Sequence, residues 1–154
     1  MFKKTLIIIL FLFLSSCGYK AIYSEKNSLN YDFSISELTF VGSRDINIKL
    51  KQKLNNYTLN KKNKDFILNI SSSVERVIIA KDASGDPTSF KTTIIVDAEV
   101  LVKNNLKNNL QITESFNYNN DTNKFNLKKY EKEIVNNLTE VAASKLIYEL
   151  SNIQ

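Results

Sequence analysis

The chain has 154 residues and a formal net charge of +5, with one cysteine and neither histidine nor tryptophan. Without histidine, there is no general base for Ser-His-Asp or Cys-His catalysis. With one cysteine, no internal disulfide can form, and zinc and copper lose their usual ligands. No glycine-rich phosphate-binding motif occurs among the three glycines. We therefore expect a protein that is not an enzyme and that holds no metal ion or other cofactor.

The first seventeen residues, MFKKTLIIILFLFLSSC, have the pattern of a bacterial lipoprotein signal. Lys3 and Lys4 precede an apolar run of about ten residues, which is too short to span a bilayer and is typical of a secretory signal. Leu14-Ser-Ser then leads to Cys17, whose thiol can carry a diacylglycerol. We predict cleavage before Cys17 and acylation of its thiol. The alternative is an ordinary N-terminal membrane anchor that contains a cysteine.

Acylation at Cys17 would anchor the chain stably, since two or three acyl chains exceed the marginal affinity of a single chain. Gly18 stands where an aspartate, in bacterial lipoproteins, signals retention in the inner membrane. The expected location is therefore the periplasmic side of the outer membrane. We divide the chain into a signal peptide (1–16), an acylated N-terminus with a tether (17–30) and a single domain (31–154).

Removal of the signal with Lys3 and Lys4 leaves 19 basic and 16 acidic residues, a net charge of +3. One explanation is base composition, because the chain is rich in Asn, Lys and Ile. The other is that some cations face anionic lipid headgroups or sugar phosphates. Nucleic acid is not an expected partner, because a secretory signal exports the chain away from it.

The domain opens with a predicted strand and helix. Apolar and polar side chains alternate over residues 31–41, which predicts a strand with a bulge near Glu37. Ser43 is expected to cap the following helix, and Asp45 in the first turn favours the helix dipole. One face of that helix is apolar, made of Ile46, Leu50, Leu54 and Tyr57.

Three more strands are predicted. One face of the first holds Phe66, Leu68, Ile70, Ser72, Val74, Ile78 and Ala80. A hairpin turn follows at 82–87, where Gly85 is free to take positive φ. The second strand has the clearest alternation, in Phe90, Thr92, Ile94, Val96, Ala98, Val100 and Val102. A polar turn is expected at 103–109, and the last strand contains Leu110, Ile112, Phe116 and Tyr118.

The period becomes helical over residues 125–150. The apolar stripe contains Leu127, Tyr130 or Glu131, Ile134, Leu138, Val141 or Ala142, Leu146 and Leu150. The element order β-α-β-β-β-α predicts an α+β fold. We expect a two-layer sandwich, in which two helices cover one face of a four-stranded, mostly antiparallel sheet.

The start of the predicted mature chain, CGYK at 17–20 followed by AIY at 21–23, resembles that of the alphaproteobacterial lipopolysaccharide-assembly lipoproteins, LptE. The element order, the turn at 83–87 before a long strand and the paired alanines at 142–143 in a terminal helix are also similar. The resemblance implies a plug lipoprotein seated inside the outer-membrane barrel LptD, which helps insert lipopolysaccharide into the outer leaflet. It also implies that lipopolysaccharide is bound without being transformed.

Arg76, Lys81 and Lys91 flank the predicted hairpin turn and are candidate contacts for lipopolysaccharide phosphates, because they could converge near its tip on stiff strands. The alternative for each is a solvated charge that discourages edge-to-edge aggregation. Asp82 and Asp86 in the same turn could neutralise these cations. Their spacing does not fit an EF-hand calcium loop.

Two other functions are compatible with the sequence. A non-catalytic accessory or pilot lipoprotein of another envelope assembly machine would share the anchor and the domain, and would differ in its partner. A carboxylate-based glycosidase would need two facing carboxyl groups roughly 5 to 9.5 Å apart. Asp97 and Glu99 fall on the same strand face, where cross-strand pairing is the simpler explanation.

Overall fold

The computed structural model describes residues 31–103 and 105–153. The predicted signal peptide, the acylation site Cys17 and the tether lie outside the described residues. None of the helices in the described ranges is long and apolar enough to cross a membrane.

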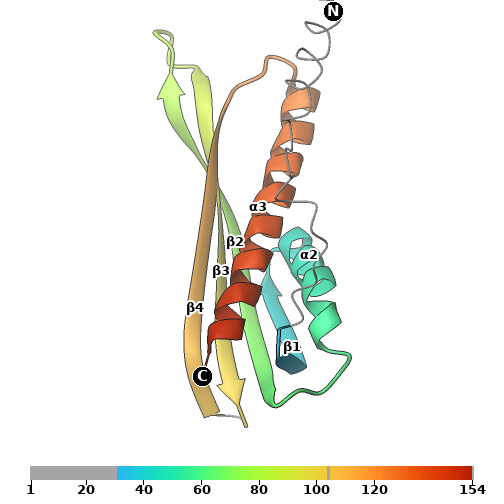
Figure 1. The fold of residues 1–154 in the computed structure, drawn as a ribbon. Helices are drawn as coiled ribbons and strands as arrows, with labels where there is room; N and C mark the ends of the chain where they lie inside the picture. Colours follow the sequence, from blue (N-terminus) through green and yellow to red (C-terminus); the bar gives the residue numbers. More distant parts are fainter. Residues whose placement is uncertain (1–30, 104, 154) are drawn as a thin grey trace, which may run out of the picture. The chain divides into compact units, whose positions relative to one another are not determined.

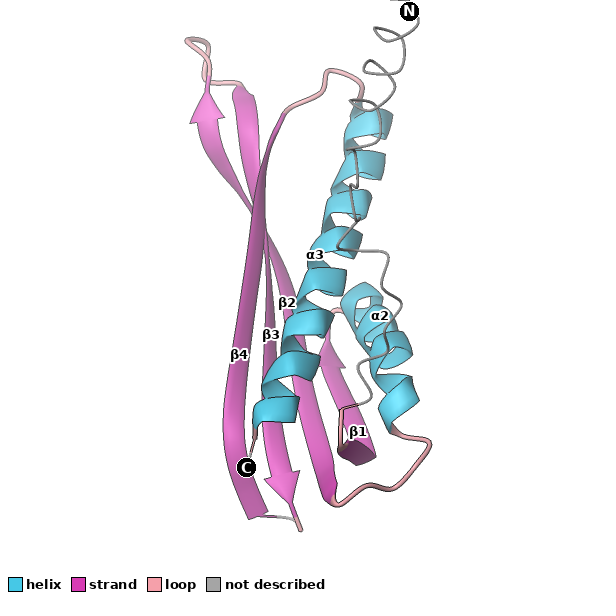
Figure 2. Ribbon diagram, viewed as in Figure 1, coloured by secondary structure: helices cyan, strands magenta, loops and turns pink. Residues whose placement is uncertain are grey.

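The described domain is a four-stranded sheet in the order β1-β2-β3-β4, with both helices on one side of it (Figures 1 and 2). The elements are β1 (Phe33–Gly42), α2 (Arg44–Leu54), the 3-10 turn η1 (Asn55–Tyr57), β2 (Lys64–Lys81), β3 (Pro87–Val102), β4 (Asn105–Asn119) and α3 (Lys124–Asn152). β1 and β2 are parallel because a helix connects them, and the other pairs are antiparallel. The predicted fold class is confirmed.

The connection between β1 and α2 agrees closely with the prediction from the sequence. The register between β1 and β2 shifts between Ile35 and Glu37, which confirms the predicted bulge. Ser43 occupies the N-cap position, although its side chain makes no capping hydrogen bond. Its backbone N–H donates to the carbonyl of Ser72 at 2.9 Å. Gly42 before it has a φ of 97°, and a Cβ there would overlap the same carbonyl, so β1 ends at a residue that must be glycine.

The hydrophobic core lies between the sheet and the two helices. β3 supplies the predicted alternating set, with Phe90, Thr92, Ile94, Val96, Ala98 and Val100 all buried. α2 buries Ile46, Leu50 and Leu54 as predicted. The buried face of α3 contains Leu127, Ile134, Leu138, Ala142, Ala143, Leu146 and Leu150. Ala142, and not Val141, therefore belongs to the apolar stripe, and both alanines are fully buried.

The second half of β2 departs from its predicted burial. Phe66, Leu68 and Ile70 are buried, whereas Val74 and Ile78 are each 47% exposed. In Figure 1 the turn ends of β2 and β3 lie apart from α3, so fewer side chains cover this half of β2. We name residues 74–90 the arm. Its tip is the predicted hairpin turn, where the Asp82 carboxylate accepts hydrogen bonds from two backbone N–H groups of the turn.

β4 begins earlier than the sequence predicts. The polar turn expected at 103–109 is wrong from Asn105 onward, because Asn105 already pairs with Val102 and Asn109 with Glu99. β4 is an edge strand of the sheet, and its first residues are exposed. Polar side chains are therefore compatible with strand structure there, and their polarity is not a turn signal.

Candidate functional site

The three cations that the sequence placed at the arm do not converge. Arg76 is paired in register with Thr92, and its side chain lies on the helix-covered face of the sheet. Lys91 is paired with Val77, one position further along, so its side chain lies on the opposite face. Lys81 is exposed at the end of β2, five residues and roughly 16 Å of strand from Arg76. The expected convergence of Arg76, Lys81 and Lys91 is wrong, because successive strand residues point to opposite faces and Lys81 lies further along the strand.

Arg76 instead joins the arm to α3. Its Nε lies 2.9 Å from Oε1 of Glu131 on α3 and donates a hydrogen bond of 3.1 Å to the hydroxyl of Tyr118 on β4. Its guanidinium carbon lies 3.7 Å from the centre of the Phe90 ring, which is a cation–π contact. Tyr118 donates to Glu131 at 2.8 Å and accepts from Thr92 at 3.2 Å. We name these five residues the Arg76 network.

Tyr118 is the centre of this network. Its side chain is buried, and burial raises the pKa of its hydroxyl above the usual value. The hydroxyl therefore stays protonated at neutral pH and can donate to the Glu131 carboxylate. The same oxygen accepts hydrogen bonds from Arg76 and Thr92, so it links β2, β3, β4 and α3 at one point.

A groove lies between the arm and the first turns of α3. Its volume is about 670 Å³, and we name it the cationic groove. It is lined by Arg76, Val77, Ile78, Pro87, Phe90, Lys124, Leu127, Lys128 and Glu131. Lys124, Lys128 and Glu131 are spaced four and three residues apart and so share one face of α3. The groove thus combines three cations and one carboxylate with an apolar wall.

The start of α3 favours an anion near this groove. The side chain of Asn123 caps the helix by accepting hydrogen bonds from two backbone N–H groups. The first turn contains no acidic residue, while lysines occur at 124, 128, 129 and 132. Cations near the positive end of a helix dipole are unfavourable, and a bound anion would offset them. Sequence reasoning missed Lys124 and Lys128, although this run of lysines without an early acid was a readable signal.

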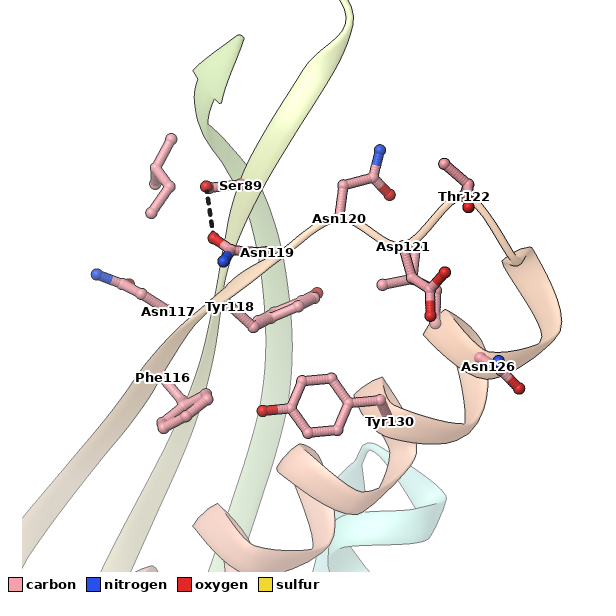
Figure 3. Close-up of a pocket in the computed structure, with 12 residues that line it drawn as sticks. Ser89, Phe116, Asn117, Tyr118, Asn119, Asn120, Asp121, Thr122, Asn126 and Tyr130 are labelled. Carbon is pink, nitrogen blue, oxygen red and sulfur yellow. Dashed lines mark hydrogen bonds between the residues drawn. The ribbon is translucent and has the colours of Figure 1, made fainter. Parts of the chain in front are cut away.

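A second hollow, of about 770 Å³, lies where the end of β4 meets the start of α3 (Figure 3). It is lined by Ile79, Ser89, Phe116, Asn117, Tyr118, Asn119, Asn120, Asp121, Thr122, Asn126, Leu127 and Tyr130. We name it the polar hollow. Leu127 lines both hollows, and the Arg76 network lies between them.

The acidic residues discussed from the sequence have ordinary partners. Asp97 accepts a hydrogen bond of 2.8 Å from Gln111, and Glu99 accepts one of 3.3 Å from Asn69. Both are cross-strand contacts, which is the simpler of the two explanations considered for them. Asp82 holds the tip of the arm. In the described part of the chain, no group of three or more acidic or cysteine side chains is placed to hold a metal ion.

No protein-family model matches the sequence, and no curated protein matches it. Solved structures do match the fold. Rare lipoprotein B from Shewanella oneidensis is similar with a TM-score of 0.58 and 16% identity, over 75% of this chain and 93% of that chain. For the minor lipoprotein from Acinetobacter baumannii, the TM-score is 0.60 and the identity 15%, over 79% and 91%. The chain has the fold of these lipoproteins.

A third similar structure is lipoprotein B from Nitrosomonas europaea, with a TM-score of 0.53 and 15% identity. The match covers 77% of this chain and 83% of that chain. In all three comparisons, the aligned part is most of the solved lipoprotein. The shared fold therefore extends over 83–93% of each similar structure.

The Tyr118→Phe substitution tests the Arg76 network, because it removes the shared hydroxyl and keeps the buried ring. We expect the free energy of unfolding to fall by about 1–3 kcal/mol, since Arg76, Thr92 and Glu131 each lose a hydrogen-bond partner. Urea denaturation followed by circular dichroism measures this change.

The matched control is Tyr148→Phe. Tyr148 is 57% exposed, and its hydroxyl makes no hydrogen bond within the described residues. Its replacement should change the free energy of unfolding by less than about 0.5 kcal/mol. Equal effects of the two substitutions would show that the Tyr118 hydroxyl does not stabilise the domain.

Proposed function

We propose that the protein is an outer-membrane lipoprotein, anchored on the periplasmic side through acylated Cys17. In this proposal it is the plug partner of the barrel LptD in lipopolysaccharide transport and insertion. It binds lipopolysaccharide in the cationic groove and does not transform it. The observation that carries the binding proposal is the groove itself, which places three cations beside an apolar wall.

Two independent observations support the lipid anchor. The sequence ends its apolar signal with Leu-Ser-Ser-Cys, and Cys17 is the single cysteine of the chain. The described domain has the fold of three solved lipoproteins from other bacteria. The resemblance of residues 17–23 to LptE supports the assignment to lipopolysaccharide assembly.

The chemistry of the groove fits an anionic lipid. Lipopolysaccharide carries phosphates and carboxylates on an acylated sugar, so its recognition requires cations next to apolar surface. Arg76, Lys124 and Lys128 provide the cations, and Ile78 and Leu127 are part of the apolar wall. The three positive charges exceed the single negative charge of the wall, so an anion is favoured.

Arg76 is held in a position suited to an anion. Its two polar contacts within the described residues are both made by Nε, and its side chain is 44% exposed. A guanidinium binds phosphate best through two parallel N–H groups. With Nε fixed by Glu131 and Tyr118, the terminal nitrogens are the part of Arg76 that a ligand would meet.

Lys81 and Lys91 are weaker candidates for contacts with lipopolysaccharide. Lys81 lies on the arm and Lys91 directly follows it, and neither residue lines the cationic groove or the polar hollow. A charge reversal at Arg76 is also unsuitable as a binding test, because it would set a carboxylate against Glu131 and disturb the network. Lys124 and Lys128 are both exposed and are better positions to change.

The anchor is tested by Cys17→Ala in the full chain. The variant should remain an unprocessed precursor and incorporate no labelled fatty acid, because no other thiol is present. Metabolic labelling with a fatty acid measures this. Ser16→Ala, which keeps a small residue before the cleavage point, should be labelled like the native chain. Label retained by Cys17→Ala would overturn the lipoprotein assignment.

Lipopolysaccharide binding is tested by the double substitution Lys124→Glu and Lys128→Glu. We expect the affinity of the purified protein for lipopolysaccharide to fall about ten- to a hundredfold, since each exposed ionic contact contributes up to about 1 kcal/mol and here two are reversed. The loss should be larger at low salt, where screening is weak. Titration at two salt concentrations measures both effects.

The control for charge alone is the double substitution Lys51→Glu and Lys53→Glu on α2. It changes the net charge equally, and both residues are exposed and line neither hollow. Its affinity should stay within about threefold of the native value. Equal losses in the two double variants would mean that the groove is not the binding site.

A further inference from the structure

We propose that the polar hollow is a binding site for an uncharged saccharide. The proposal deepens the proposed function and rests on it in one respect, because it assigns the sugar to the same glycolipid whose anionic part enters the cationic groove. The hollow borders that groove, and Leu127 lines both. It nevertheless has a different chemistry, which the lining side chains determine.

The polar hollow carries almost no charge. None of its lining residues is a lysine or arginine, and its one charged side chain is that of Asp121. The Asp121 carboxylate already accepts a hydrogen bond of 2.8 Å from the backbone N–H of Asn123. In the neighbouring groove, by contrast, three cations line the wall. The polar hollow therefore favours a ligand that is polar and uncharged, because it has no cation to balance the charge of a phosphate.

The rim of the hollow supplies hydrogen-bonding groups of both kinds. Asn126 and Thr122 are exposed, and their side chains make no hydrogen bond within the described residues. Asn117 and Asn119 also line the hollow, and in Figure 3 they lie on the side of β4 away from Tyr130 and Asn126. Asn119 accepts from Ser89 at 3.1 Å, which leaves its amide nitrogen for a ligand. An amide both donates and accepts, as does a sugar hydroxyl.

Two aromatic rings are exposed in the same place. Phe116 on β4 is 46% exposed, and Tyr130 on α3 is 45% exposed. In Figure 3 the ring of Tyr130 is directed from α3 toward the strand that carries Phe116 and Tyr118. The rings of Tyr118 and Tyr130 meet edge to face, with centres 6.0 Å apart, which fixes their orientation. The rings of Phe116 and Tyr130 therefore present exposed apolar surface next to the amide of Asn126, within a hollow whose lining is mostly polar.

A sugar ring matches this combination. One of its faces is formed by C–H groups and packs on aromatic rings, while its hydroxyl groups project from the edge. Phe116 and Tyr130 would contact the C–H face, and Asn126 and Thr122 would bond the hydroxyl groups. The volume of about 770 Å³ lies within the range of roughly 300–1,000 Å³ that is common for small-molecule sites. It is large enough for a short oligosaccharide.

The test uses the acylated full-length protein in detergent micelles and two uncharged probes. The first is the neutral oligosaccharide obtained from lipopolysaccharide after removal of its acyl chains, its phosphates and its carboxylate-bearing sugars. The second is N,N′-diacetylchitobiose, which represents the amino sugars of the cell wall. Saturation-transfer NMR detects binding, and titration gives the affinity. We expect the first probe to bind with a dissociation constant of about 1 mM.

Two variants and two controls locate the site. Phe116→Ala and Tyr130→Ala should each weaken binding at least about tenfold, which is the loss of roughly 1.4 kcal/mol. Both rings are half exposed, so circular dichroism should show an unchanged fold. Tyr148→Ala, on an exposed part of α3 that does not line the hollow, should bind normally. The Lys124→Glu and Lys128→Glu double variant should also bind normally, because these probes carry no charge.

Each outcome decides part of the proposal. Binding of neither probe, or equal binding by native protein and both aromatic variants, would overturn the saccharide site. Binding of chitobiose alone would support the site and overturn its link to the glycolipid. Because the probes lack phosphate and acyl chains, a failure here leaves the cationic groove untouched. Conversely, failure of lipopolysaccharide binding at the groove would leave this site standing.

Discussion

The contact of Arg76 with Glu131 and Tyr118 determines how the arm sits against α3, and both hollows depend on that arrangement. Beyond Ser72 the arm has little buried apolar surface, since Val74 and Ile78 are nearly half exposed. The hydrophobic effect therefore contributes less there than in the core, and polar contacts have more influence. The network satisfies its groups with hydrogen bonds of 2.8–3.2 Å, and the Phe90 ring lies under the guanidinium. Residues of the network line both sites. Tyr118 lines the polar hollow, and Arg76, Phe90 and Glu131 line the cationic groove.

Two different chemistries therefore lie side by side near one end of the domain. The cationic groove has charge and apolar area, as an anionic lipid requires, and the polar hollow has amides and aromatic rings, as a neutral sugar requires. Lys124, in the first turn of α3, opposes the helix dipole. This cost is consistent with a surface shaped for a ligand rather than for stability alone.

The spacing of apolar residues along the chain predicted much of the fold, because burial in the hydrophobic core follows this spacing. The alternation in β3 and the helical period in α3 both correspond to buried faces. The same alternation gave a wrong prediction in β2, where Val74 follows the pattern of Leu68 but is 47% exposed. The alternation of side chains along each strand could by itself have predicted that Arg76 and Lys91 lie on opposite faces of the sheet. The pairing of Arg76 with Glu131, 55 positions apart in the chain, depends on how α3 packs and has no local signal.

In the proposed function, the protein is a lipoprotein that works with an outer-membrane barrel in lipopolysaccharide assembly. The most direct measurement is purification of the tagged, acylated protein from detergent-solubilised membranes, with its partners identified by mass. We predict that the barrel LptD is recovered together with lipopolysaccharide. Recovery of a secretin or another envelope assembly complex, without that barrel and without lipopolysaccharide, would contradict the account and favour the function of a pilot or accessory lipoprotein.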